Sequence, residues 1–234
     1  MSARQLAALT REIVACDACP RLRAHCVEIA RVKRRAYLDW TYWGKPVPPF
    51  GDPLARVVVI GLAPGAHGAN RTGRVFTGDK SGDFLYRALH ETGFASQPNS
   101  DSRDDGMRLT DCWITASVRC APPDNKPLPG EVNRCRSYLV RELTALQNSR
   151  VMVCLGKLAF DNYLRILKAE AKIESAGAFE FGHGAEYDLP GAGVTLIASY
   201  HPSQQNTSTK RLTADMLRAV FYRARQVAAC PGKG

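Results

Sequence analysis

The chain has 234 residues, 45% of them hydrophobic, which gives one domain with a sizeable core and excludes a largely disordered protein. Its longest apolar stretch, residues 57–66, is broken by glycine and proline, so no segment is expected to cross a membrane. The net charge of +10, from 32 basic and 22 acidic residues, favours a polyanionic partner such as nucleic acid, although a generally basic proteome would give the same surplus.

Strands and helices are expected to alternate along a single domain that spans residues 1–234. The β-branched run at 56–60 predicts a buried strand, and residues 81–92 predict a helix with Ser81 or Asp83 as its N-cap. The elements expected after these are a strand at 112–118, a helix at 131–147, a strand at 151–155, a helix at 157–167, an irregular segment with room for a hairpin at 170–193, a strand at 194–199 and a helix at 213–227.

Strands separated by helices predict an α/β fold with a parallel sheet covered on both faces. Ligands of such sheets bind beyond the carboxyl ends of the strands. The loops that leave those ends are residues 61–78, 119–130 and 200–213, and these loops hold nearly all the unusual residues of the chain.

The loop after the first strand reads GLAPGAHGANRTGRVFTGD from Gly61 to Asp79. Its glycines allow the backbone to approach a ligand closely. It matches neither the phosphate-binding pattern GxxxxGK[ST] nor the dinucleotide fingerprint GxGxxG, so by itself it indicates only a ligand site.

The loop after the last strand begins YHPSQQNT at Tyr200. His201 directly follows a buried strand and is restrained by Pro202, which favours a ring that points into the cleft. A surface histidine is the alternative. The polar run at 203–209 suits contacts to phosphate through hydroxyl, amide and backbone groups.

The eight cysteines have several interpretations. The N-terminus lacks the apolar core of a signal peptide, so we expect a cytosolic, reducing location, where a disulfide framework is not expected. Cys16-x-x-Cys19 with two distant cysteines suits zinc and an iron–sulfur cluster equally, and packed free thiols are a third reading.

Three segments carry a resemblance to a known family: GLAPGAHGANRTGR with FTGD in the first loop, VRCAPPDNKP at 118–127, and HPS, NT and RLT in the last loop. Together they resemble the uracil-DNA glycosylase superfamily, most closely its family 5, the B-type enzymes of bacteria and archaea. The resemblance implies a three-layer α/β/α fold with a central four-stranded parallel sheet. It also implies a monomer that hydrolyses the N-glycosidic bond of uracil in nucleoid DNA, in base-excision repair.

The resemblance further implies a [4Fe–4S] cluster held by Cys16, Cys19, Cys120 and Cys135. Such a cluster would tie the N-terminal segment to the loop after the second strand. No ligand position matches the other four cysteines, Cys26, Cys112, Cys154 and Cys230. Of these, Cys112 and Cys154 fall in predicted strands and are expected to be core thiols.

Site residues follow from the same resemblance. Phe76 would stack on a base flipped out of the helix, and His201 would donate a hydrogen bond to uracil O2, where negative charge develops as the bond breaks. The further expected contacts to base, water or DNA backbone are Gly61, Leu62, Ala63, Gly65, Asn125, Ser203 and Arg211, together with Asn70 and Asn206.

The residue that handles the attacking water is less obvious. Many superfamily members carry an acidic or amide side chain where this chain has Leu62 and Ala63. Asp79 is therefore the candidate for activating the water or stabilising the sugar cation, and a helix N-cap is its alternative role.

The pocket is expected to be roomy, because Ala63 and the sequence Thr-Ala-Ser at 115–117 replace polar side chains of relatives. The expected substrates therefore include, besides uracil, hydroxymethyluracil, ethenocytosine, hypoxanthine and xanthine. No matched position supplies a lysine nucleophile, so strand nicking is not expected.

Two other functions have partial support in the sequence. A hydrolase using Ser203, His201 and Asp79 lacks the GxSxG elbow, and its serine would lie too close to the histidine in sequence. The second is a non-catalytic iron–sulfur protein that binds DNA. Residues 31–43, basic and aromatic, either contact DNA or pack on the surface, and contact is the favoured reading.

Overall fold

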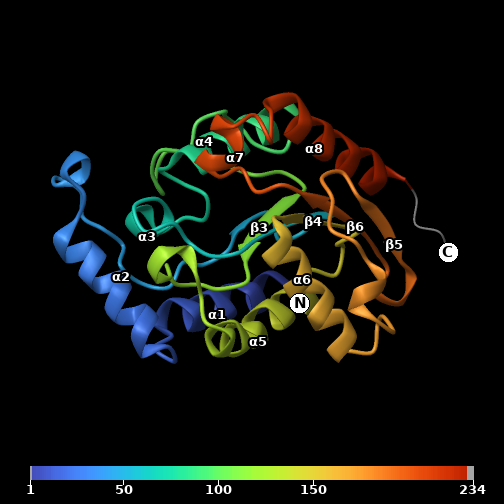
Figure 1. The fold of residues 1–234 in the computed structure, drawn as a ribbon, viewed down its shortest axis with the longest axis horizontal. Helices are drawn as coiled ribbons and strands as arrows, with labels where there is room; N and C mark the ends of the chain where they lie inside the picture. The colour runs from blue at the N-terminus through green and yellow to red at the C-terminus, as the bar shows by residue number, and fades with distance from the viewer. Residues whose placement is uncertain (1, 231–234) are drawn as a thin grey trace.

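The computed structural model describes residues 2–230, so residue 1 and residues 231–234 of the expected domain lie outside the described part. Its centre is a six-stranded sheet in the order β1-β3-β2-β4-β6-β5 (Figure 1). The four central strands are parallel, which confirms the predicted four-stranded core. These strands are β3 (Cys112–Ala116), β2 (Val57–Gly61), β4 (Val151–Leu155) and β6 (Val194–Ser199).

Two antiparallel edge strands extend this core. β1 (Phe50–Gly51) pairs with β3, and β5 (Glu186–Leu189) pairs with β6. β5 and β6 form a hairpin, but only β5 lies in the irregular segment at 170–193, because the second strand is the one predicted at 194–199. β1 was not predicted, since two residues carry no periodicity.

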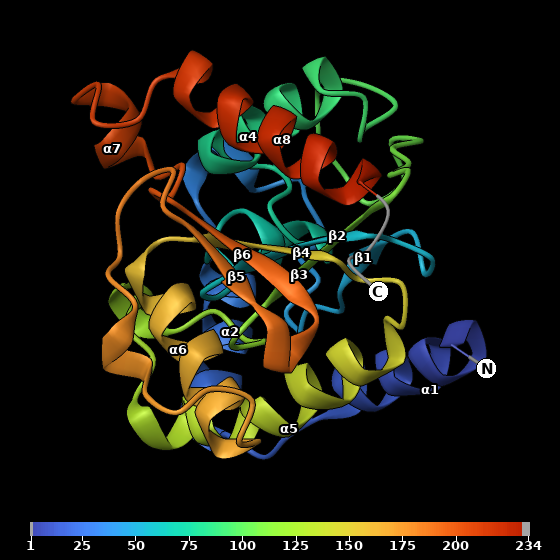
Figure 2. The same ribbon diagram turned by 90° about the vertical axis from the view of Figure 1, so that its right-hand side faces the viewer.

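Helices cover both faces of the sheet, as Figures 1 and 2 show. On one face lie α4 (Lys80–Glu91) and α8 (Ala214–Ala229), and on the other α1 (Ser2–Ala15), α5 (Pro129–Ala145) and α6 (Lys157–Ala169). Successive residues of a strand point to opposite faces. In β2, Val57 and Val59 therefore join the core under α4 and α8, whereas Val58 and Ile60 join the core under α5 and α6.

The remaining helices belong to segments that showed no predicted element. α2 (Pro20–Val32) and the short 3-10 helix η1 (Arg35–Tyr37) precede β1. α3 (Ala69–Thr72) and α7 (Gln204–Ser208) lie inside the first and last loops, and three further 3-10 turns are η2 (Pro123–Asn125), η3 (Ala176–Ala178) and η4 (Pro190–Ala192). Within residues 2–230, no helix is long and apolar enough to span a membrane.

One predicted detail of α4 is wrong. Its N-cap is Asp79, not Ser81 or Asp83, because Asp79 has an extended backbone and its carboxylate accepts the N–H of Gly82 at 3.0 Å. The helix consequently begins one residue earlier than expected, at Lys80.

Candidate active site

A cavity of about 690 Å³ opens beyond the carboxyl ends of the central strands. The chain runs from β2 to β3 on one side and returns to β4 on the other, so this is the point at which the strand order reverses and at which such sheets bind ligands. The predicted residues among those that line the cavity are Leu62, Ala63, Gly65, Phe76, Asp79, Asn125, His201 and Ser203.

His201 lies half-buried at the cavity wall, two residues after the end of β6. Its backbone carbonyl accepts a hydrogen bond from Asn206 Nδ2 at 2.9 Å, which fixes the start of the last loop. Burial lowers the pKa of the ring to about 4. The imidazole is therefore neutral at physiological pH and carries a single N–H donor.

Phe76 forms the wall next to His201, with 5.8 Å between the two ring centroids and 34° between the ring planes. Its ring lies over Gly61, where an added Cβ would come within 2.8 Å of the ring. Gly61 thus makes room for Phe76 and does not itself line the cavity. Phe76 also has a left-handed backbone, with φ of 50°.

Asp79 has two roles, one for each carboxylate oxygen. Oδ1 accepts the N–H of Gly82, and Oδ2 faces the glycines of the first loop. A Cβ on Gly65 would lie 2.8 Å from Oδ2, and a Cβ on Gly68 would overlap it. Burial raises the pKa of Asp79, and the N–H groups of Gly82 and Ser81 oppose that rise.

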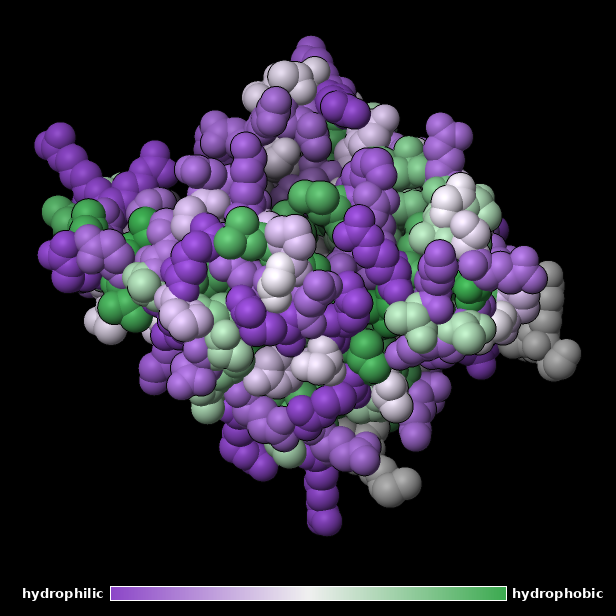
Figure 3. All heavy atoms as spheres, turned by 60° about the horizontal axis from the view of Figure 1, so that its bottom comes forward, coloured by the Kyte–Doolittle hydropathy of each residue, from purple (hydrophilic) through white to green (hydrophobic). Residues whose placement is uncertain are grey.

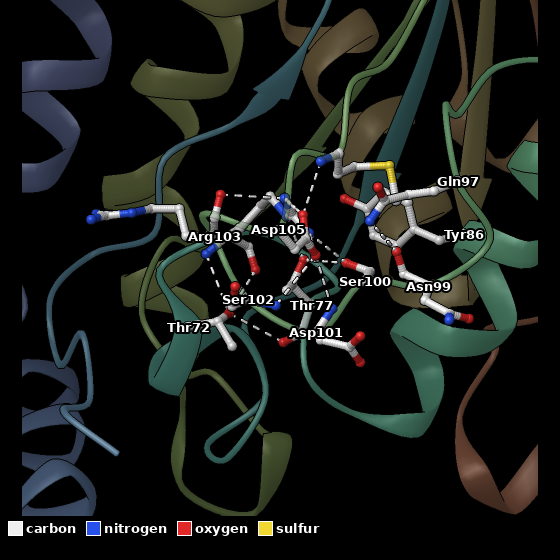
Figure 4. Close-up of polar contacts among 12 residues, drawn as sticks. Thr72, Thr77, Tyr86, Gln97, Asn99, Ser100, Asp101, Ser102, Arg103 and Asp105 are labelled. Atoms are coloured by element: carbon white, nitrogen blue, oxygen red, sulfur yellow. Dashed lines mark hydrogen bonds and ion pairs between the residues drawn. The ribbon is translucent and has the colours of Figure 1, made fainter. Parts of the chain in front are cut away.

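A buried polar network holds the segment that carries Phe76 and Asp79 (Figure 4). Arg74, 3% exposed, forms an ion pair with Asp105 at 2.6 Å and donates to Thr77 Oγ1 at 2.9 Å. Burial disfavours the Asp105 anion, but the Arg74 guanidinium and backbone N–H groups outweigh it and hold its pKa at about 2. Gly78 N also donates to Ser100 O at 2.9 Å, so the two residues between Phe76 and Asp79 are both held by hydrogen bonds.

Besides Gly61, three expected contacts lie outside the cavity. Asn70 is fully buried and its Nδ2 donates to the carbonyls of Cys26 and Ala66, so it does not line the cavity in this structure. Asn206 instead supports the His201 carbonyl. Arg211 is exposed, with its guanidinium 4.7 Å from the ring centroid of Tyr200.

Ser203 lines the cavity, but its hydroxyl caps α7 by accepting from Asn206 N at 3.4 Å. In the described residues no hydrogen bond joins the side chains of Ser203, His201 and Asp79, so they do not form a hydrolase triad.

Sequence reasoning assigned no role to the lining residues His67 and Lys80. Other lining residues had been considered only as parts of longer segments: Arg34 and Tyr37 in 31–43, Ala116 in 115–117 and Gln204 in 203–209. His67 stands within the first motif, and its Nδ1 is 3.0 Å from the hydroxyl of Tyr42. Burial lowers the pKa of His67. Its place in the motif was the available signal, whereas nothing local indicated that Arg34 and Tyr37 reach the cavity.

The thiols expected to hold a cluster lie in one region between α2, the loop after β3 and α5. Cys19, Cys120 and Cys135 are buried in a common apolar cluster, which also contains Cys26. Cys16 is half-buried, and its thiol and that of Cys135 both act on Tyr138, whose pKa they raise to about 12 together with burial. Within residues 2–230, no three acidic, histidine or cysteine side chains are close enough to hold a single metal ion.

Cationic groups face these thiols. Arg134 Nε donates to Cys19 Sγ at 3.4 Å. The neighbouring Cys26 thiol and burial raise the pKa of Cys120, and the guanidinium of Arg23 opposes that rise. The buried Nη1 of Arg23 has no hydrogen-bond partner among the described residues. Positive charge next to clustered thiols stabilises thiolates, the form that binds metals.

The chain is similar to known proteins of one family. The family model described as "Uracil DNA glycosylase superfamily" matches residues 48–225. The type-5 uracil-DNA glycosylase of Thermus thermophilus is 49% identical over 94% of this chain and 97% of its own length, and that of Pyrobaculum aerophilum is 46% identical over 93% and 91%.

The type-4 uracil-DNA glycosylase of Archaeoglobus fulgidus is more distant, at 33% identity over 67% of this chain and 70% of its own length. Among solved structures, that of SMUG2 from Pedobacter heparinus aligns over 74% of this chain and 75% of its own, with a TM-score of 0.45 and 13% identity. The chain belongs to the uracil-DNA glycosylase superfamily, in which it groups with the type-5 enzymes.

Proposed function

We propose that this chain hydrolyses the N-glycosidic bond of uracil in DNA and leaves an abasic site for base-excision repair. The observation that carries the proposal is a neutral, half-buried His201 in the same cavity as the Phe76 ring and the Asp79 carboxylate. The chain is nearly half identical to proteins named for this activity, over almost their whole length.

Chemistry at the base requires a nucleotide that has left the duplex, because the glycosidic bond is not accessible in the stack. In the cavity the flipped base would stack on Phe76, with backbone groups of Leu62, Ala63 and Gly65 along its edge. The His201 N–H would then donate to uracil O2 as that oxygen gains charge. An aimed donor of this kind contributes on the order of 3 kcal/mol to the barrier, and a ring already fixed at the wall needs little reorganisation.

The sugar becomes cationic as the base departs, and a water must attack it. Oδ2 of Asp79 is the cavity carboxylate oxygen not engaged in capping α4. We assign to it the positioning of the water or the stabilisation of the cation. Asn125, exposed at the cavity mouth, would contact the base or the water.

A tolerant pocket follows from its small side chains. Ala63 and Ala116 line the cavity where a larger polar group would restrict the base. We therefore expect activity on hydroxymethyluracil, ethenocytosine, hypoxanthine and xanthine as well as uracil. Lys80 lines the cavity but is exposed to solvent, unlike the desolvated amines that form Schiff bases, so strand nicking is not expected.

The four expected cysteines fit a [4Fe–4S] cluster by their chemistry. Cys19, Cys120 and Cys135 share one apolar region and Cys16 is half-buried near α5, where it acts on Tyr138. Arg23 and Arg134 supply positive charge that a bound tetrathiolate cluster calls for. Bound there, the cluster would supply a structural link, and Cys16, Cys19, Cys120 and Cys135 would hold α1, α2, the loop after β3 and α5 together. No step of base removal depends on it.

The test is single-turnover incubation with duplexes that each carry one uracil, hypoxanthine, xanthine or ethenocytosine, followed by alkaline cleavage. Strand breaks should appear only after alkali, and His201→Ala should slow them by roughly 10²–10³-fold with DNA binding retained. Binding without excision of any base would favour the non-catalytic iron–sulfur protein. We further infer one domain and a monomer that acts on DNA in the nucleoid.

A further inference from the structure

Residues 33–43, here named the basic aromatic segment, lie beside the cavity between α2 and β1. The guanidinium of Arg71 is sandwiched between two of its rings, 3.9 Å from the centroid of Tyr37 and 4.0 Å from that of Trp40. Arg71 is itself fixed, because its Nη2 donates to the carbonyl of Gly78 at 2.6 Å. The segment is thereby attached to the loop that carries the site.

Further contacts hold the segment in place. Trp43 N donates to Arg71 O at 2.9 Å, and the Tyr42 hydroxyl lies 3.0 Å from His67 Nδ1. The Trp43 ring covers Gly73, where an added Cβ would come within 2.8 Å of it. Contacts along the length of the segment therefore fix its position relative to the cavity.

The charge of the segment is not neutralised within the protein. Arg34 and Arg35 are exposed, and the ion pairs formed within residues 2–230 include neither of them. Asp39 is the only carboxylate in the segment. Arg34 also lines the cavity, so its charge lies where a bound nucleotide would enter.

An apolar side chain stands at the tip of the segment. Leu38 is 56% exposed, and Lys33 Nζ donates to its carbonyl at 2.8 Å, which closes the turn. The end of α2 and the following turn form the left edge of the molecule in Figure 1, and at that edge Figure 3 shows hydrophobic atoms among hydrophilic ones. Leucines presented in this way pack against or between bases that have lost a stacking partner.

We propose that the basic aromatic segment is a second DNA-contacting element, separate from the last loop. Arg34 and Arg35 neutralise phosphates next to the flipped nucleotide, and Leu38 packs against the base stack that flipping opens. DNA seated with a nucleotide in the cavity has to pass over this segment, since Arg34 and Tyr37 form part of the cavity wall. The proposal rests on the proposed function only in placing a flipped nucleotide in the cavity.

The charge is tested by the salt dependence of binding to a duplex that carries an abasic-site analogue. Arg34→Ala/Arg35→Ala should make the slope of log Kd against log salt shallower by about 0.9 for each phosphate that is no longer neutralised. The control is Arg4→Ala/Arg11→Ala, which removes the same charge from exposed positions on α1, a helix that packs on α5 across the molecule from α7 (Figure 2). The same slope in both double variants would overturn the phosphate contacts.

The tip is tested by comparing duplex and single-stranded uracil substrates, because only the duplex has a stack to open. Leu38→Ala should lower the ratio of duplex to single-strand rates about tenfold. The control Leu54→Ala changes another exposed leucine, 62% exposed in the turn before β2, and should leave the ratio unchanged. A wild-type ratio in Leu38→Ala would overturn the stacking role.

Failure of the glycosylase proposal can be distinguished from failure of the DNA-contact proposal, because the salt dependence of DNA binding is measured without base excision. Fluorescence of 2-aminopurine placed beside the uracil also requires no excision, and it reports unstacking of the bases in the bound duplex. Absence of excision together with a shallower slope and reduced 2-aminopurine emission in the segment variants would refute the enzyme activity while supporting this DNA contact.

Discussion

Substitution of Asp79 separates the two roles of its carboxylate oxygens. Oδ1 caps α4 through Gly82 N, and Oδ2 faces the cavity beside Gly65 and Gly68. Asparagine caps a helix about as well as aspartate does, so Asp79→Asn keeps the cap and removes only the negative charge. Asp79→Ala removes both the cap and the charge.

The expected magnitudes follow from these contacts. Loss of an N-cap costs about 1 kcal/mol, which lowers Tm by about 2–4 °C in a chain of this size. Asp79→Ala should therefore melt about 2–4 °C below the wild type, whereas Asp79→Asn should melt close to it. If the charge stabilises the sugar cation or positions the water, about 3 kcal/mol is lost in both variants, and the single-turnover rate falls about 10²-fold.

The assay is single-turnover excision from a uracil duplex with enzyme in excess, measured beside thermal unfolding by circular dichroism. Asp83→Asn is the matched control, because it removes a charge from the exposed first turn of the same helix, outside the cavity. A wild-type rate in Asp79→Asn would refute a catalytic role for the charge and leave Asp79 as a cap alone.

Burial lowers the pKa of His201 to about 4, so the single-turnover rate should show no inflection near pH 6.5. An inflection near pH 6.5 that disappears in His201→Gln would contradict a neutral ring. Since this pKa lies below that of an unfolded histidine, the stability contributed by the neutral ring is full above about pH 6.5 and is lost as pH falls toward 4. Cys120→Ser should lose iron and unfold at a lower temperature. In the control Cys154→Ser, which changes a core thiol of β4, the iron should be retained. Stoichiometric zinc in protein prepared without oxygen would exclude the cluster. Arg211→Ala should weaken binding to all sequences alike and make the salt slope shallower by about 1, and an unchanged slope would place Arg211 off the DNA path.

The strands were predictable because buried parallel strands carry continuous apolar runs. All five residues of β2 and of β4 are buried, and the predicted bounds lie within one residue of the observed ones. α1 was not predicted, although its buried residues Leu6, Leu9 and Ile13 stand at helical spacing and carried the signal. β1 offered no such signal, because its two residues are defined only by pairing with β3.

The site was predictable as a set of loops but not as a set of contacts. The place of loops at the carboxyl ends of strands follows from topology, and the motif resemblance selected His201, Phe76 and Asp79 within them. The support of these residues depends on partners far along the chain. Arg74 reaches Asp105, 31 positions away, and no local pattern marks such a pair.

The first loop brings three parts of the molecule together within ten residues. Asn70 Nδ2 donates to the carbonyl of Cys26 in α2 at 3.3 Å, Arg71 holds the basic aromatic segment, and Asp79 faces the cavity. Because α3 carries both Asn70 and Arg71 within a single buried turn, the segment next to the thiols cannot shift without moving the cavity wall. This gives a physical reason for the proposed structural cluster: by fixing α2, it would fix the loop on which the base is held, since Ala63 and Ala66 of that loop line the cavity and pack against the thiols.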